Sequence, residues 1–185
     1  MSLILGPDRE CDYLDERNED FSNEDCGCSS FCSSSFKVCI FLCSSFRSSS
    51  FVDCTFVDCN FSSSDFSSSS FSRCKFVSCL FKGTLFSKVR MKDVKIENST
   101  FLYVSFDNSD LKNSGIYNSK INDGSFNEVS CKNFSLHSDN LSGTSFKGTS
   151  MSLICVKMSD IGGKYHNEGA NEKEEAALDA VVELA

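Results

Sequence analysis

Large apolar residues recur at every fifth position along most of the chain. From Phe21 to Ile161, all 29 positions spaced five residues apart are apolar, and no insertion or deletion interrupts the series. Seventeen of the 18 phenylalanines lie on this register. A period of five matches neither the period of about 3.6 residues of an α-helix nor that of about two residues of a simple β-strand. The pattern therefore predicts a repeat architecture.

A second repeating position carries small residues. The residue two places before each register residue is Ser, Cys, Thr or Val at every step from Ser29 to Ser99, and the other three positions hold nearly all of the charge. We therefore expect one large and one small residue of each pentad to face inward. This pattern fits a coil in which the chain turns a corner every five residues. The short strands of one coil would stack on those of the next coil at a strand-to-strand spacing of ~4.8 Å. Four sides close a coil, so residues 20 apart are expected to stack.

The pentads themselves resemble a known family. The segments "CTFVD", "CNFSS", "SDFSS" and "CKFVS" match the pattern of the pentapeptide-repeat proteins, which is a small residue, a polar residue, Leu or Phe, and two variable positions. The resemblance covers about residues 19–163. It implies an all-β fold, a right-handed quadrilateral parallel β-helix of about seven coils, with a shaft of ~34 Å at sheet spacing.

Two residues interrupt the pattern of small positions. Phe134 occupies a small position, and Gly124 is the only glycine at any such position, half a coil earlier. We predict that Phe134 points inward and that the missing side chain of Gly124 makes room for it. Asp139, also at a small position, is a misfit that suggests a local hydrogen bond or exposure.

Three segments are expected along the chain. They are an N-terminal cap over residues 1–20, the β-helix over 21–165, and a C-terminal tail over 166–185 that includes a helix from "NEKEEAALDAVVELA". The apolar stripe of this helix has two interpretations. It covers the last coil, or it forms a homodimer contact, as the resemblance to gyrase-interacting members implies. The contact candidates are Leu178, Val181, Val182 and Ala185.

The cysteines and the N-terminus favour a cytoplasmic protein. No export or membrane segment is expected, because the first apolar patch is four residues long and no basic residue precedes it. The 12 cysteines should then stay reduced. Stacked cysteines at the small positions favour core packing over disulfides. Whether the thiols near the first coil bind a metal or stay free is left open by their spacing; they are Cys11, Cys26, Cys28 and Cys32.

No catalytic motif accompanies the repeats. The chain has no glycine-rich phosphate loop, paired-His metal motif or nucleophile elbow, and its two histidines have no nucleophile nearby in the stacking scheme. We therefore predict that the protein is not an enzyme and has no cofactor.

The net charge of −8 is unevenly distributed. Residues 1–20 and residues 166–185 each carry −5, whereas residues 21–165 carry +2. The family resemblance implies a DNA-mimic modulator of bacterial DNA gyrase, of the quinolone-protection type. Duplex DNA carries about one negative charge per 1.7 Å, so a shaft that mimics it would need on the order of 20 uncompensated negative charges. The charge distribution argues against this alternative, and the acidic composition argues against direct binding of nucleic acid.

A cluster of basic residues lies between residues 73 and 95. Lys92 is also expected to stack with Lys112 and Lys132, a like-charge series that suggests an acidic protein partner, while a solvated surface is the simpler interpretation. The leading hypothesis is a non-enzymatic, rod-shaped protein-binding or scaffold protein. The candidate binding residues, named here the basic belt, are Arg73, Lys75, Lys82, Lys88, Arg90, Lys92 and Lys95.

Overall fold

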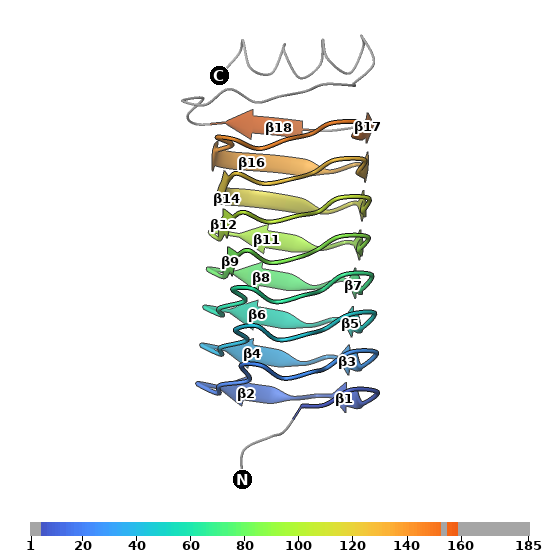
Figure 1. The fold of residues 1–185 in the computed structure, drawn as a ribbon, viewed down its shortest axis with the longest axis vertical. Coiled ribbons are helices and arrows are strands. Elements are labelled where there is room, and N and C mark those ends of the chain that lie inside the picture. Colours follow the sequence, from blue (N-terminus) through green and yellow to red (C-terminus); the bar gives the residue numbers. More distant parts are fainter. Residues whose placement is uncertain (1–4, 153–154, 159–185) are drawn as a thin grey trace.

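The chain folds into a four-sided parallel β-solenoid. The computed structural model describes residues 5–152 and 155–158, which form strands, bridges and turns but no helix. In Figure 1 the coils stack along one axis, from the coil with residues 10–17 at one end to that with residues 150–158 at the other. Paired residues are 20 apart, except at one bulge. The predicted all-β parallel solenoid is confirmed, and the predicted C-terminal helix lies outside the described residues.

The first side of the solenoid, face 1, is an eight-stranded sheet. Its strands follow one another at steps of 20 residues, and the central residue of each strand from β1 to β15 is buried. In order of stacking they are β1 (Glu10–Asp12), β3 (Ser30–Cys32), β5 (Ser50–Val52), β7 (Ser70–Ser72), β10 (Arg90–Lys92), β13 (Asp110–Lys112), β15 (Ser130–Lys132) and β17 (Ser150–Ser152).

The next two sides share a ten-stranded sheet. Face 2 contains β2 (Asp15–Arg17), β4 (Ser35–Lys37), β6 (Thr55–Val57), β8 (Lys75–Val77), β11 (Lys95–Glu97), the first part of β14 (Gly115–Asn122), β16 (Ser135–Asn140) and β18 (Cys155–Met158). Face 3 contains β9 (Leu80–Lys82), β12 (Thr100–Leu102) and the rest of β14.

Face 4 is held by isolated bridges, which run from Asp25 to Ser145. Local hydrogen bonds replace longer strands on this side. For example, Asp65 Oδ1 accepts a hydrogen bond from the backbone N–H of Ser67, and Phe66 O accepts one from the N–H of Ser69. Side chains that bond to nearby backbone groups favour turns over extended strands.

The first coil begins earlier than the apolar register indicates. Strands β1 and β2 lie within residues 1–20, which we expected to form a separate cap, yet they pair with β3 and β4 in the same parallel register. Backbone pairing does not require a large apolar residue, so polar positions such as Glu16, which pairs with Phe36, join the sheet. The structure thus assigns residues 10–17 to the solenoid.

The corners from Asp8 to Asn133 each have a residue in the left-handed conformation. The residue two positions after each register position has φ between 48° and 64° from Asp8 to Asn133, and only Gly83 in this series is glycine. Asn, Asp and Gly tolerate this conformation best, and they occupy many of these corners. Val38 does so as well, with φ of 57°, although a β-branched residue is poorly suited to it.

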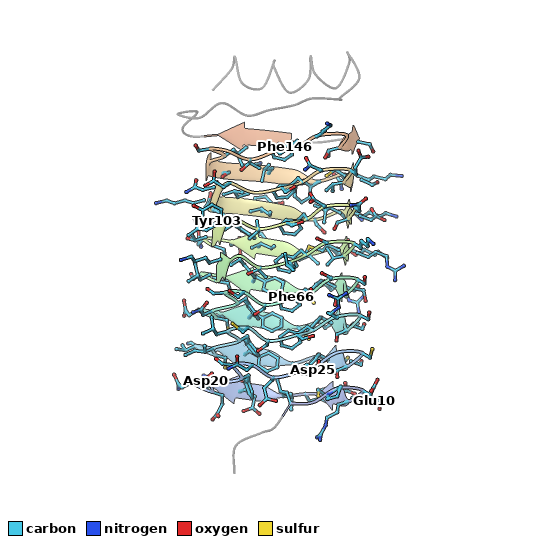
Figure 2. All side chains as sticks on the ribbon, in the orientation of Figure 1. Glu10, Asp20, Asp25, Phe66, Tyr103 and Phe146 are labelled. Atoms are coloured by element: carbon cyan, nitrogen blue, oxygen red, sulfur yellow. The ribbon has the colours of Figure 1, made fainter. Side chains whose placement is uncertain are left out.

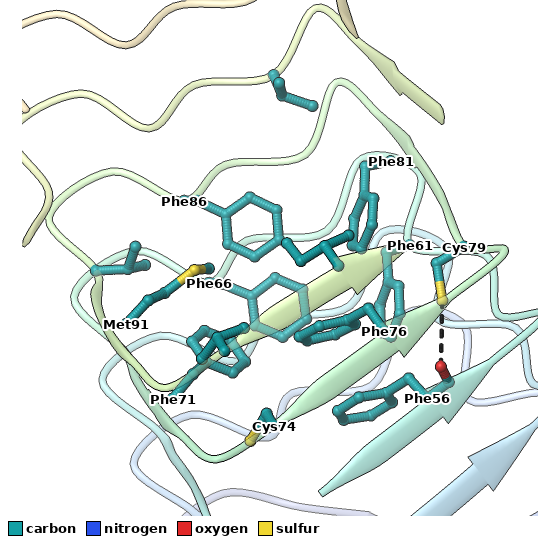
Figure 3. Close-up of a cluster of buried hydrophobic side chains, with 14 of the residues drawn as sticks. Phe56, Phe61, Phe66, Phe71, Cys74, Phe76, Cys79, Phe81, Phe86 and Met91 are labelled. Carbon is teal, nitrogen blue, oxygen red and sulfur yellow. Dashed lines mark hydrogen bonds between the residues drawn. The ribbon is translucent and has the colours of Figure 1, made fainter. Parts of the chain in front are cut away.

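Stacked phenylalanine rings fill the core (Figure 3). Rings 20 residues apart lie parallel, as in Phe46 and Phe66, whose centroids are 4.9 Å apart with an interplanar angle of 6°. Rings five apart meet at steep angles, as in Phe61 and Phe66, at 5.5 Å and 66°. Such aromatic pairs contribute ~0.5–1.5 kcal/mol beyond the burial of their area.

The small positions form a second network between coils. The N–H of Ser29 donates to Ser49 Oγ at 3.1 Å, and that hydroxyl donates to Cys26 O at 2.8 Å. A thiol serves in the same way where Cys79 Sγ donates to Phe56 O at 3.6 Å (Figure 3). The stacked cysteines at these positions are buried free thiols, in keeping with core packing.

The structure describes both Phe134 and Gly124, the two residues that interrupt the pattern of small positions. Phe134 is buried, with 5% of its surface exposed, so the prediction that it points inward is confirmed. The three atoms nearest to a Cβ at Gly124 would belong to Ile121, Thr144 and Phe126, and Phe134 is not among them, so the proposed compensation gains no support.

A β-bulge accounts for the second irregularity. Ser119 pairs with Ser138 and Lys120 with Asn140, so the pairing shifts by one residue and then returns to the 20-residue step. Ser138 is buried here, and its Oγ donates to Ser119 O at 2.8 Å. The bulge therefore shifts the backbone pairing at the step where the repeat assigned a small position to Asp139.

Replacing Phe66 tests the ring stack. Its side chain is fully buried between Phe46 and Phe86. We expect Phe66→Ala to lower the free energy of unfolding by ~3–5 kcal/mol because of lost transfer energy and the remaining cavity. Phe66→Leu should cost less, since Leu111 occupies the register elsewhere. Urea unfolding measures both changes, with Ser68→Ala as the surface control, and an equal loss for Ala and Leu would contradict a packing role.

Replacing Val38 tests the corner geometry. Its side chain is 45% exposed, so Val38→Asn removes little buried area. We expect this variant to raise the free energy of unfolding by about 1 kcal/mol, because the left-handed conformation is unfavourable for most residues and tolerated by Asn. The reciprocal change at the corner residue Asn98, Asn98→Val, should destabilise the protein. Chemical denaturation of both variants checks this, and the same sign for both would refute it.

Candidate partner-binding surface

The solenoid distributes the basic belt over several sides. Arg90 and Lys92 lie in β10 on face 1, and Lys75 and Lys95 lie in β8 and β11 on face 2. Lys82 ends β9 on face 3. Arg73 and Lys88 occupy corners, with φ of 52° and 59°. The belt is therefore not a single surface, although it is continuous in the sequence.

Arg73 is engaged by an acidic residue one coil away. Its Nε donates to Asp53 Oδ1 at 2.7 Å and its Nη2 donates to Asp53 Oδ2 at 2.8 Å. These hydrogen bonds lower the pKa of Asp53. A bidentate pair of this kind satisfies both groups, so Arg73 is less available to a partner than the sequence suggests.

Lys75 and Lys95 share one carboxylate. Lys75 Nζ lies 3.0 Å from Glu97 Oε2, and Lys95 Nζ lies 2.6 Å from Glu97 Oε1. Hydrogen bonds, chiefly from Lys95 and then from Lys75, lower the pKa of Glu97. The repulsion between these two lysines, which pair in the sheet register, is thus offset. Glu97 lies just outside the basic belt in the sequence. Its position two residues after Lys95, on the same face of the strand, could have identified it as an ion-pair partner.

An aromatic residue completes the group on face 2. Lys95 Nζ lies 5.4 Å from the centre of the Tyr117 ring, and this ring meets that of His137 at 5.1 Å. A Cβ at Gly115 would lie 2.5 Å from Tyr117 side-chain atoms, so glycine at this position is what allows the ring to lie there. The 20-residue step pairs Tyr117 with His137, but the spacing pattern does not indicate the role of Gly115.

Lys92, Lys112 and Lys132 form a different arrangement, named here the lysine ladder. They are exposed on face 1 and pair in register in β10, β13 and β15. None of the ion pairs found within residues 5–158 that the structure describes involves a ladder lysine. The like-charge series predicted from the sequence is therefore present and is not neutralised by a neighbouring side chain.

Polar residues and carboxylates border the ladder. On the adjoining corner, Asn113 Nδ2 donates to Asp93 Oδ1 and Asn133 Nδ2 donates to Asn113 Oδ1, each at 3.2 Å. On face 1 itself, Asp110 lies two residues before Lys112 and pairs with Arg90 in the sheet register. The ladder is thus one residue wide, and the backbone sheet fixes the spacing of its attachment points.

Negative charge gathers at the opposite end of the solenoid. Residues 5–28 contain nine acidic and two basic residues. Figure 2 shows Glu10, Asp20 and Asp25 near this end of the solenoid. The acidic residues of this first part of the solenoid therefore lie away from the lysine ladder.

Catalytic and metal-binding arrangements were sought in the same region. Within residues 5–152 and 155–158, no three His, Cys, Asp or Glu side chains are placed to share a metal ion. Burial raises the pKa of Cys26 to about 12, so this thiol is protonated at neutral pH.

No helix among the described residues is long and apolar enough to cross a membrane. The dimer candidates Leu178, Val181, Val182 and Ala185 lie outside the described residues.

Comparison with known proteins identifies the repeat. Residues 29–106 match the family model described as the pentapeptide repeat region. A search of curated proteins found no match.

Comparison with solved structures found matches at low sequence identity. HetL, a pentapeptide repeat protein involved in heterocyst differentiation regulation from the cyanobacterium Nostoc sp. strain PCC 7120, is 8% identical, with 88% of this chain and 94% of that chain covered and a TM-score of 0.45. A trypsin-treated form of QnrB1, a plasmid-mediated fluoroquinolone resistance protein, is 13% identical, with 100% and 99% covered and a TM-score of 0.47. Rfr23 from the cyanobacterium Cyanothece 51142 is 10% identical, with 80% and 88% covered and a TM-score of 0.22.

Reversing the central charge of the ladder tests whether the ladder is under electrostatic strain. Lys112→Glu would place a carboxylate between Lys92 and Lys132, so we expect the free energy of unfolding to rise by up to ~1 kcal/mol. The gain should shrink at high salt, because exposed charges are screened. Urea unfolding at two salt concentrations measures this effect, with Lys120→Glu on face 3 as the control. Equal changes in both variants would show that the ladder lysines do not repel one another measurably.

Proposed function

We propose that this chain, which belongs to the pentapeptide-repeat family, is a non-enzymatic, rod-shaped protein-binding or scaffold protein that recognises an acidic protein partner. The lysine ladder is the observation that supports this most directly. Its three lysines are exposed and regularly spaced, and none has an ion-pair partner among the described residues. A neutral residue at position 112 would relieve the repulsion between these lysines, yet this position carries a lysine.

The architecture suits such a role. Short strands joined by regular corners give flat sides whose side chains are held at the spacing of a parallel sheet. Extended solenoids commonly use surfaces of this kind for binding. Of the original belt, Lys92 is part of the ladder and Arg90 lies beside it, and both are included in the proposed surface. Arg73, Lys75 and Lys95 have acidic partners within the chain.

The proposal extends to the location and assembly of the protein. The eleven cysteines from Cys11 to Cys131 are all free thiols, as suits a reducing cytoplasm. We further propose a homodimer contact through the apolar stripe of the C-terminal tail, at Leu178, Val181, Val182 and Ala185, on the basis of its sequence pattern. Neither a membrane nor nucleic acid is a partner in this proposal.

Gyrase modulation by DNA mimicry is the alternative function. The family resemblance favours it, but the charge distribution does not. A DNA mimic needs dense negative charge along its length, whereas residues 21–165 carry a net charge of +2 and the excess of acidic residues lies in 1–20 and 166–185. A gyrase supercoiling assay with and without a quinolone tests this alternative, and no effect at micromolar protein would remove it.

Binding to polyglutamate tests the proposed surface. We expect the full chain to bind this acidic polymer at low ionic strength, and the triple variant Lys92→Gln/Lys112→Gln/Lys132→Gln to bind at least about tenfold more weakly, a difference of ~1.4 kcal/mol. The matched control is Lys82→Gln/Lys120→Gln/Lys147→Gln, which changes net charge equally on other sides. Equal weakening in both variants, measured by fluorescence anisotropy, would show a general charge effect and refute the ladder as the site.

A further inference from the structure

The lysine ladder has a definite length and width. Its column on face 1 begins after Ser72, which pairs with Lys92, and ends before Ser152, which pairs with Lys132. Three cations at strand spacing of ~4.8 Å span ~10 Å along the solenoid axis. A partner that matches the ladder therefore needs three negative charges in a line of this length.

Carboxylates border the ladder on both sides. Asp110 lies on face 1 beside Lys112, and Asp93 lies on the adjoining corner beside Lys92, held by the hydrogen bond from Asn113. A partner with acidic residues spread over a wide surface would bring some of them close to Asp110 and Asp93. Like charges in such positions oppose binding. The surface therefore favours a single line of negative charge.

The spacing identifies the secondary structure that supplies such a line. In an α-helix, residues i, i+3 or i+4, and i+7 lie on one side, and the rise of about 1.5 Å per residue separates the first from the last by ~10 Å. In an extended strand, three side chains on one side span ~13 Å. The helix matches the ladder, whereas the strand overshoots it by most of one coil.

On these grounds we infer that the lysine ladder binds an α-helix that carries a single stripe of Asp or Glu residues and lies along the solenoid axis. This inference rests on the proposed function and specifies the partner class for the same surface. The ladder attracts the stripe, while Asp93 and Asp110 on either side keep the helix in line. Polar or basic residues beside the stripe would face these two carboxylates.

Two designed peptides of equal composition and a proline-containing variant test the inference. One helical peptide has Glu at positions i, i+3, i+7 and i+10 on one side, and a second has the same residues redistributed around the helix. A third has the striped sequence interrupted by proline, which prevents a helix. We expect the full chain to bind the striped helix at least about tenfold more tightly than either of the others, which corresponds to ~1.4 kcal/mol. Fluorescence anisotropy at low ionic strength measures all three.

The variants already described locate the binding. The preference for the striped helix should disappear in Lys92→Gln/Lys112→Gln/Lys132→Gln and persist in Lys82→Gln/Lys120→Gln/Lys147→Gln. In Asp110→Asn/Asp93→Asn, the redistributed peptide should gain affinity relative to the striped one, because the flanking repulsion is removed. Circular dichroism confirms that each variant remains a β-solenoid.

Each outcome separates this inference from the proposed function. If all three peptides bind equally and the ladder variant loses all of them, the surface stands and the helical partner is refuted. If duplex DNA binds the ladder more tightly than the striped peptide, the protein partner is refuted. The tail also carries acidic residues, so the measurements are repeated with Glu172→Gln/Glu175→Gln/Asp179→Asn/Glu183→Gln in the full chain. Failure to prefer the striped helix in both backgrounds overturns the inference.

Discussion

The distance between stacked phenylalanine rings matches the distance between neighbouring β-strands, and the solenoid depends on this match. Rings 20 residues apart have centroid distances of 4.8–5.4 Å, and strands pair at ~4.8 Å. One axial repeat therefore satisfies the backbone hydrogen bonds and the aromatic core together. Because successive coils from Phe31 to Phe86 repeat this arrangement, an insertion of one residue would displace the rings beyond it, which explains why the register continues without interruption.

This constraint also determines which positions are free to vary. The register residue and the small residue face the core, and the corner residue must adopt a left-handed conformation. The remaining positions project outward in columns at strand spacing. Charge placed in one column therefore recurs at short, regular distances. The lysine ladder arises in this way, since three lysines at equivalent positions of successive coils become immediate neighbours.

Sequence reasoning located the ladder but misjudged the belt around it. The stacking of Lys92, Lys112 and Lys132 follows from the 20-residue step alone. The neutralisation of Lys75 and Lys95 required side-chain geometry, because one carboxylate of Glu97 reaches lysines in two coils. Likewise, the register alone did not predict the bulge at this coil. The bulge places Ser138 in the core, where its small hydroxyl satisfies the buried carbonyl of Ser119.

The amino-acid sequence by itself determined the repeat, the inward residues and the parallel stacking of the strands, because a strict spacing of five residues over 29 positions admits few other folds. It also determined the uneven distribution of charge. Only the tertiary structure decided that residues 10–17 join the first coil, that the corners from Asp8 to Asn133 are left-handed, and which basic residues have acidic partners. Those features depend on backbone angles and on distances between side chains of adjacent coils, which a spacing pattern does not specify.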